Sequence, residues 1–131
     1  MPQVKKNMKN MTLKERRVRF TILTANLIQR IATAEWPYGK VEVAMDEWTV
    51  HSPRLVKVGT ERLLAEDRVH NPKGFHPFGL ACDLLIYIDG AYITSGAHPI
   101  WNEINDMART MDPAFGLGIS FNDANHLSYG E

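Results

Sequence analysis

The stretch that most constrains the fold is residues 80–93, which read LACDLLIYIDGAYI. It predicts two strands joined at Asp89-Gly90, because an Asp-Gly pair is a strong signal for a two-residue hairpin turn. The first strand is apolar on both faces, as is typical of a central strand. Asp83 interrupts it, and an ionised carboxylate in a buried strand is costly unless it is paired or coordinates a cation. The fold must therefore provide Asp83 with a neutralising partner, either an arginine or a metal ion.

The N-terminal part of the chain predicts a helix followed by a strand. Thr12 and Glu15 form the pattern of a capping box, and the apolar residues behind them keep a helical period, so a helix is expected over about 13–34. Val41, Val43 and Met45 alternate with other residues, which predicts a strand with one buried face within 40–50.

The rest of the chain predicts two further helices and a charged loop. Ser52-Pro53 is a helix start signal, so a short helix is expected as far as Gly59, followed by a charged loop over 60–75. Residues 98–111 predict a second amphipathic helix, with Trp101 among the apolar residues on its buried side. Because helices and antiparallel strands are segregated rather than regularly alternating, we expect an α+β fold with a small antiparallel central sheet and flanking helices.

Length and composition bound the class of protein. The 131 residues fit one domain, which we place at 12–131 behind a flexible basic leader at 1–11. There is no apolar run of the roughly 18–20 residues that span a bilayer and no apolar segment typical of a Sec signal, so we expect cytoplasmic synthesis and no stable membrane insertion.

Cys82 is the single cysteine, which excludes an intrachain disulfide and a thiolate metal cage. It alternates with Asp83, so it is expected on the opposite face as a small buried hydrophobe.

The net charge is zero, but the first 20 residues are basic. A single acid, Glu15, stands there against Lys5, Lys6, Lys9, Lys14, Arg16, Arg17 and Arg19. Such a segment can attract a polyanion, but a solvated tail leading into a helix with a charged outer face is the favoured interpretation. Nucleic acid is not an expected partner, because no aromatic residue lies among these charges to stack on bases.

Two histidines can join Asp83 in a metal site. His76 precedes the central strand and can fold back toward its end, and His126 would contribute a second nitrogen if it lay on an adjacent strand. Two nitrogens, one oxygen and an open fourth position form the ligand set of catalytic zinc. On the residues alone, His70 or His98 could replace either imidazole.

Asp123 precedes His126 by three residues, which suits a general base beside the metal. It could take a proton from a water that zinc has made more acidic and pass it to a leaving amine. That sequence of proton transfers is the chemistry of peptide-bond hydrolysis.

These residues resemble the metal-dependent peptidases of the hedgehog/DD-peptidase fold, namely D-alanyl-D-alanine carboxypeptidases and phage-type L-alanyl-D-glutamate endopeptidases. That family has a Ser-x-His-x-x-Gly-x-Ala-x-Asp segment and a later Asp/Glu-x-x-His followed by a hydrophobic residue. Here the segments read GFHPFGLACD and DANHL, and the similarity extends from about Met45 to Ser128. The resemblance implies that His76, Asp83 and His126 bind Zn²⁺ and that Asp123 is the general base. It also implies a peptidoglycan stem-peptide substrate.

The chain departs from the family pattern at two positions that handle the substrate in that family. The family's serine is replaced by Gly74, and the arginine that usually precedes the Ser-Pro helix start is replaced by His51. His51 is a candidate catalytic and substrate-binding residue, with Arg54 one helical turn further on as a second substrate-binding candidate. An imidazolium would replace a guanidinium only in part and would be pH-sensitive, and His51 can equally be a solvent-facing residue at a helix start.

Two functions of different classes follow. The first is a zinc peptidase that cuts stem or cross-link peptides of bacterial peptidoglycan, as a free phage lysin acting at the cell wall in the periplasm or as a component of a virion. The second is a non-catalytic structural or binding domain of a phage particle, in contact with other virion proteins, that keeps the peptidase fold with or without the metal. The missing serine and arginine motivate the second hypothesis.

Overall fold

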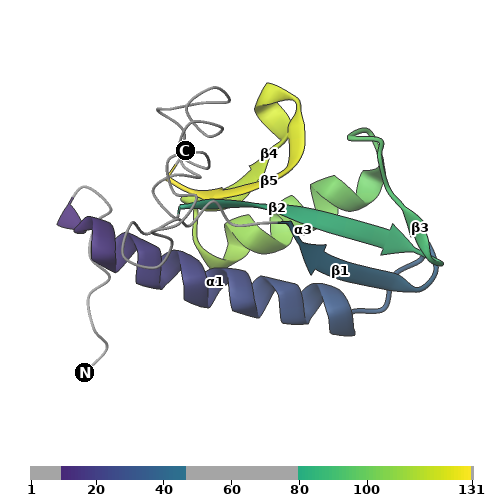
Figure 1. Cartoon of the computed structure of the whole chain (residues 1–131), viewed down its shortest axis with the longest axis horizontal. Coiled ribbons are helices and arrows are strands. Elements are labelled where there is room, and N and C mark those ends of the chain that lie inside the picture. The colour runs from purple at the N-terminus through teal and green to yellow at the C-terminus, as the bar shows by residue number, and fades with distance from the viewer. Residues whose placement is uncertain (1–9, 47–79, 131) are drawn as a thin grey trace, which may run out of the picture.

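The computed structural model describes residues 10–46 and 80–130. Its elements, in chain order, are α1 (Leu13–Thr33), β1 (Val41–Met45), β2 (Ala81–Ile88), β3 (Ala91–Tyr92), α3 (Pro99–Met111), β4 (Phe115–Gly118), the short 3₁₀ helix η3 (Ile119–Phe121) and β5 (Asp123–Tyr129). The strand order is β1-β2-β5-β4, with β3 paired to β2, and every pairing is antiparallel. Both α-helices contact the sheet and each other (Figure 1). The expected α+β class with a small antiparallel sheet and flanking helices is confirmed.

Helix α1 begins and ends close to the predicted positions. The Thr12 hydroxyl accepts a hydrogen bond from the Glu15 backbone N–H at 3.1 Å, and the Glu15 side chain accepts one from the Thr12 backbone, so the capping box is present. The helix ends at Thr33, where the Trp36 indole donates to the carbonyl oxygen of Ile31 at 2.9 Å. Its buried side carries Phe20, Leu23, Thr24, Leu27 and Ile31.

Helix α3 covers the predicted range of residues and buries the predicted face. His98 is its N-cap, and the ring Nδ1 accepts a hydrogen bond from the backbone N–H of Ile100 at 3.1 Å. Ile100, Trp101 and Ile104 are buried in the core. Strand β4 contacts α3, and its Phe115 packs edge-to-face against Phe20 of α1 with ring centroids 5.9 Å apart.

The turn between β2 and β3 has the predicted form. Asp89 and Gly90 have φ angles of 50° and 81°, and positive φ at both central residues is the requirement of a type I′ hairpin turn. The Asp89 carboxylate also accepts the backbone N–H of Lys40 at 2.9 Å, which fixes the start of β1 against the turn. These contacts set the register of β1 on β2, in which Met45 lies opposite Leu84.

Strand β2 is the central strand, and one of its edges is divided between two partners. Along that edge, β5 pairs with residues 81–83 and β3 pairs with residues 87–88. The N–H of Ile93 extends the second pairing by donating to the carbonyl oxygen of Ile86. Between these two pairings β5 leaves β2, so the sheet forks there.

The C-terminal end of β5 is fixed to both helices. The Tyr129 hydroxyl donates to the Asp112 carboxylate at 3.2 Å, and the Arg19 Nε donates to the same oxygen at 3.0 Å. The other oxygen of Asp112 accepts the backbone N–H of Ala114 at 2.9 Å. This cluster, which we call the Asp112 cluster, consists of Arg19, Asp112, Ala114 and Tyr129, and it holds α1, α3 and β5 together.

Several expectations fall on residues outside the described ranges. These are most of the leader at 1–11, the short helix after Ser52-Pro53 and the loop at 60–75. Within residues 10–46 and 80–130, the structure has no helix with the length and apolarity that crossing a membrane requires.

Candidate functional site

Asp83 and His126 are brought together by strand pairing. In the antiparallel register of β2 and β5, Asp83 lies directly opposite His126, so both side chains project from the same face of the sheet. The His126 Nδ1 is 3.7 Å from the Asp83 Oδ1. His126 therefore lies on the strand adjacent to Asp83, which is the condition under which the two residues could share a metal site.

The two partners are buried to different degrees. The His126 side chain is 7% exposed, whereas that of Asp83 is 34% exposed. The sequence argument assumed full burial of the strand on both faces, and this was wrong for the Asp83 face. The reason is that Cys82, Leu84 and Ile86 face the helices and are fully buried, whereas on the other face of β2 only Ala81 is buried and the residues from Asp83 onward are partly covered. The cost of charging Asp83 is correspondingly smaller than the sequence suggested.

A bulge in β5 brings Asp123 to the same imidazole. In a regular strand, residues three apart project from opposite faces, so Asp123 and His126 should point away from each other. Here Leu117 pairs with Leu127 and the next residue, Gly118, pairs with Asp123, so three residues of β5 have no partner on β4. This bulge reverses the alternation, and the Asp123 Oδ2 lies 3.8 Å from the His126 Nδ1. Asp123 is 53% exposed, so its carboxylate is open to solvent.

Helix η3 packs an aromatic ring against His126. The Phe121 and His126 ring centroids are 5.8 Å apart with an interplanar angle of 68°. The turn ends at Asn122, which has a positive φ of 59° and leads the chain into β5. Gly118 makes this arrangement possible, because a Cβ there would meet the Phe121 ring and would lie 2.7 Å from the Asp123 carbonyl oxygen. A glycine, a one-turn helix and a bulge thus fix the orientation of His126.

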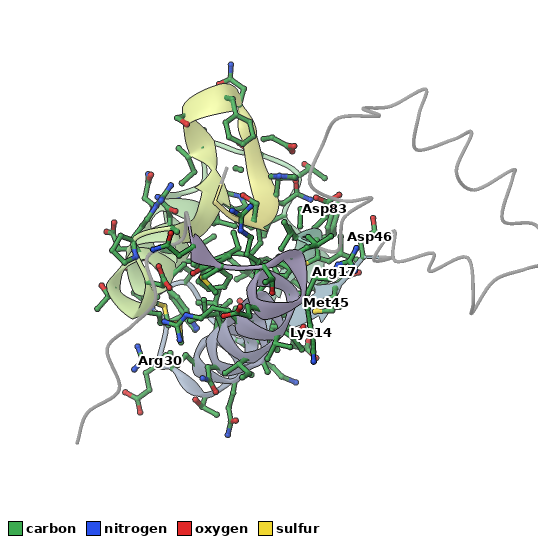
Figure 2. All side chains as sticks on the ribbon, turned by 90° about the vertical axis from the view of Figure 1, so that its left-hand side faces the viewer. Lys14, Arg17, Arg30, Met45, Asp46 and Asp83 are labelled. Carbon is green, nitrogen blue, oxygen red and sulfur yellow. The ribbon has the colours of Figure 1, made fainter. Side chains whose placement is uncertain are left out.

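Asp46 is a third carboxylate on this part of the sheet, and sequence reasoning missed it. Its backbone N–H donates to the Asp83 carbonyl oxygen at 2.9 Å, which extends the β1–β2 register by one residue and makes it the cross-strand neighbour of Asp83 (Figure 2). Asp46, Asp83 and His126 therefore form a row across three strands. The signal that could have located Asp46 is the alternation of β1, which was recognised only as far as Met45.

The distance between the Asp83 Oδ1 and the His126 Nδ1 can be compared with that of a hydrogen bond and with that between two ligands of one zinc ion. Hydrogen bonds between nitrogen and oxygen span about 2.7–3.2 Å. Two ligand atoms on one tetrahedral zinc, each about 2.0–2.1 Å from it, lie about 3.3–3.4 Å apart. The observed 3.7 Å between the Asp83 Oδ1 and the His126 Nδ1 is too long for a direct hydrogen bond and close to a ligand-to-ligand spacing. An imidazole nitrogen and a carboxylate oxygen are also donors that zinc accepts, so this pair fits two positions of a zinc site.

The described residues do not complete a metal site by themselves. Within the two described ranges, no group of three or more His, Cys, Asp or Glu side chains has the geometry to hold a metal ion. His76, the remaining ligand implied by the family resemblance, lies outside these ranges, as do His51, Arg54 and the alternative ligand His70. The other alternative, His98, caps α3 with its Nδ1 and packs edge-to-face on Tyr38, which gives it a structural role in the fold.

Cys82 takes the place predicted for it. It lies opposite Leu127, is fully buried, and faces the helices rather than the Asp83 side of the sheet. Burial, with a smaller contribution from the neighbouring Asp83 carboxylate, raises the pKa of its thiol to about 12. A thiol with this pKa stays protonated at neutral pH, so Cys82 is not a nucleophile.

A cavity of about 180 Å³ opens beside Asp123, at the fork of the sheet. One wall is the chain after β3, including Ile93, Thr94 and Gly96, and the opposite wall is the start of β5. Trp101 of α3 also lines it. Comparison of the chain with known protein families, with characterised proteins and with solved structures finds no match.

Proposed function

We propose that the protein is a zinc-dependent peptidase of the hedgehog/DD-peptidase type that hydrolyses peptide bonds of bacterial peptidoglycan. The observation that carries the proposal is the convergence of Asp83, His126 and Asp123. These residues come from two strands, and the last two reach the same side only because of a bulge. Bulges that re-aim a side chain are over-represented next to active sites.

The ligands of the proposed zinc are His76, Asp83 and His126, in agreement with the family resemblance. Within the described residues, the support is the spacing of 3.7 Å between the Asp83 Oδ1 and the His126 Nδ1. The ion would polarise the substrate carbonyl and lower the pKa of water toward neutrality. The alignment of the Phe121 ring on His126 keeps the imidazole in one orientation, as a ligand residue requires.

Asp123 is the proposed general base. Its carboxylate is half exposed and faces the same nitrogen as Asp83, so water and substrate can reach it. It removes a proton from the attacking water, whose oxygen forms a bond to the peptide carbonyl carbon. It then gives that proton to the amide nitrogen as the carbon–nitrogen bond breaks, which releases an amine and a carboxylic acid.

The decisive experiment is digestion of purified peptidoglycan with identification of the fragments by mass spectrometry. Asp123→Asn should keep zinc and lose at least about 100-fold in turnover, because general base catalysis contributes about 10²–10⁴. His76→Ala should lose both zinc and activity. Asp106→Asn, an exposed carboxylate on α3, is the matched control and should behave as the wild type.

Two results would contradict parts of the proposal. Equal turnover of the wild type and Asp123→Asn would remove Asp123 from the mechanism. Bound zinc without hydrolysis between about pH 5 and 9, a range that covers titration of a replacement imidazole such as His51, would favour the structural domain of a phage particle instead.

A further inference from the structure

The solvent-facing side of α1 carries apolar side chains where a surface helix is normally charged. One row along the helix, with spacings of four and three residues, consists of Val18, Ile22, Ala25, Gln29 and Ala32. All five are exposed, and Val18 and Ile22, at 51% and 53%, are the most exposed large apolar side chains among the described residues. This row, which we call the outer stripe, lies on the side of α1 that points away from the sheet (Figure 1).

The polar groups beside the outer stripe are uncharged and partly bonded within the helix. Residues 20–29 contain no charged side chain. The hydroxyls of Thr21 and Thr33, both exposed, donate to the carbonyl oxygens of Arg17 and Gln29 at 2.8 Å each, so they do not depend on water for their donated hydrogen bond. A surface of this kind is better suited to contact with another apolar surface than with water.

The composition of the outer stripe suits a second helix. Ala25 and Ala32 have short side chains that allow another helix to approach closely, and Val18 and Ile22 supply larger side chains beside them. Spacings of four and three residues are those of the seam between two packed helices. A helix that lies in a membrane surface instead carries Trp, Phe or Leu on its apolar face, which the outer stripe does not. A helix is therefore the better-fitting partner.

The charges at the two ends of α1 favour an antiparallel partner. At its start, residues 13–17 carry three basic side chains, including Lys14, against Glu15, which belongs to the capping box. At its other end the chain continues to the exposed Glu35, and the last carbonyl groups of a helix carry partial negative charge. Arg30, the basic residue of the last turn, points to another side of α1 than Lys14 (Figure 2). Two parallel copies of α1 would bring their basic starts together, whereas antiparallel copies place each basic start beside the Glu35 end of the other.

We propose that the outer stripe is the interface of a homodimer, in which α1 packs antiparallel against α1 of a second copy about a twofold axis at Ala25. With the axis there, Val18 lies beside Ala32 of the second copy, and Lys14 lies near the end of the second helix, which Glu35 follows. The inference is independent of the proposed function, because no residue of the outer stripe belongs to the candidate site.

Disulfide trapping with the full-length chain tests both the interface and its direction. The single native cysteine, Cys82, is buried and does not compete with an introduced thiol. Ala25→Cys should form a cross-linked dimer under mild oxidation, because this residue faces its own copy across the axis. Val18→Cys alone should not, because antiparallel packing separates its two copies by about 21 Å along the helix. A mixture of Val18→Cys and Ala32→Cys should cross-link. Self-cross-linking of Val18→Cys as readily as of Ala25→Cys would contradict the antiparallel arrangement.

Sedimentation velocity over a range of concentrations measures the strength of the association. Ile22→Lys puts a charge in the middle of the outer stripe and should raise the dimer Kd at least about 100-fold. Thr110→Lys introduces the same charge at an exposed position of α3 and, as the matched control, should leave the Kd unchanged. Lys14→Glu should raise the Kd about tenfold, because it turns two attractions into repulsions, and adding Glu35→Lys should restore it.

Three results would overturn the inference. The first is a wild-type chain that stays monomeric up to about 1 mM. The second is a dimer whose Kd Ile22→Lys leaves unchanged. The third is a monomer in solution that binds vesicles of phosphatidylglycerol and phosphatidylcholine through Ile22, since loss of vesicle binding in Ile22→Lys would assign the outer stripe to a membrane surface instead.

Discussion

The two ends of β5 carry two carboxylate clusters that differ in their spacing. At the C-terminal end, the Asp112 cluster is closed, since both oxygens of Asp112 accept hydrogen bonds of 2.9–3.2 Å from Arg19, Ala114 and Tyr129. At the other end, Asp83 and Asp123 lie 3.7 Å and 3.8 Å from the His126 Nδ1. We call these three residues the His126 cluster.

The difference separates a structural cluster from a candidate site. A carboxylate whose oxygens are filled by protein donors at hydrogen-bond distance stabilises the fold and has little capacity left for a ligand. The spacings of the carboxylates from the shared His126 nitrogen are instead close to those of two atoms that bind one metal ion. Substitutions in the Asp112 cluster should therefore change stability, and those in the His126 cluster should change binding.

The largest expected effect is that of Asp83→Asn on zinc binding. The carboxamide keeps the shape of the side chain but removes the anionic ligand, so zinc affinity should fall by at least about 100-fold. The free energy of unfolding in chelator should change by less than about 1 kcal/mol, because the side chain is 34% exposed. Competition with a chromophoric chelator measures the affinity, and unchanged affinity would exclude Asp83 as a ligand.

Asp112→Ala should lower the stability of the protein and not its zinc affinity, which is the opposite of the effect of Asp83→Asn. It leaves Arg19, Tyr129 and the Ala114 N–H without their shared acceptor, and the free energy of unfolding should fall by about 2–3 kcal/mol. The zinc affinity of the folded protein should not change. Urea denaturation measures the loss, and Asp112→Asn should show a smaller one because it retains an acceptor for Ala114. A loss of zinc affinity equal to that of Asp83→Asn would break the distinction between the clusters.

Gly118→Ala should lower both the stability of the protein and its zinc affinity to a moderate degree. The added Cβ would meet the Phe121 ring and the Asp123 carbonyl oxygen, so the ring that aligns His126 must move. We expect a loss of about 1–2 kcal/mol in stability and of about tenfold in zinc affinity. Gly96→Ala is the matched control, because its Cβ would make an ordinary contact with Ala124 at 3.4 Å. Equal behaviour of the two variants would show that Phe121 does not position His126.

The smallest effect concerns Tyr129 at alkaline pH. Burial raises the pKa of its hydroxyl, and the Asp112 carboxylate adds to the shift. The folded state thus favours the neutral phenol, and its contribution to stability is complete below pH 10 and is lost as pH rises toward the folded pKa. Tyr129→Phe should lose about 1 kcal/mol at neutral pH and should show a shallower loss of stability above pH 10. Parallel stability curves for the two proteins would contradict this assignment.

Local sequence signals predicted the elements of the fold well. The capping box of Thr12 and Glu15, the Asp89-Gly90 turn and the periodicity of residues 98–111 each depend on neighbouring residues, and the structure confirms all three. The opposite placement of Cys82 and Asp83 follows from strand alternation in the same way.

The arrangement around the candidate site was less accessible from sequence. The fork of β2 depends on pairing between segments about 40 residues apart, and register of that kind has no local signature. The bulge of β5 arises between the neighbouring strands β4 and β5, but strand alternation alone does not reveal it. For the same reason Asp46, which is placed by the β1–β2 register, was missed. The proximity of Asp123 to His126 was expected from their role in a reaction, yet regular strand geometry would have forbidden it.

The three residues of β5 that have no partner on β4 give the protein a degree of freedom that the rest of the sheet lacks. A deletion or insertion within an ordinary strand turns every later side chain to the opposite face. Residues 124 and 125, which have no partner on β4 or on β2, can change in number while the pairings of Leu117 with Leu127 and of Asp83 with His126 stay in place. Variation in the length of this segment would therefore alter the reach of the Asp123 carboxylate and leave the hydrophobic core as it is.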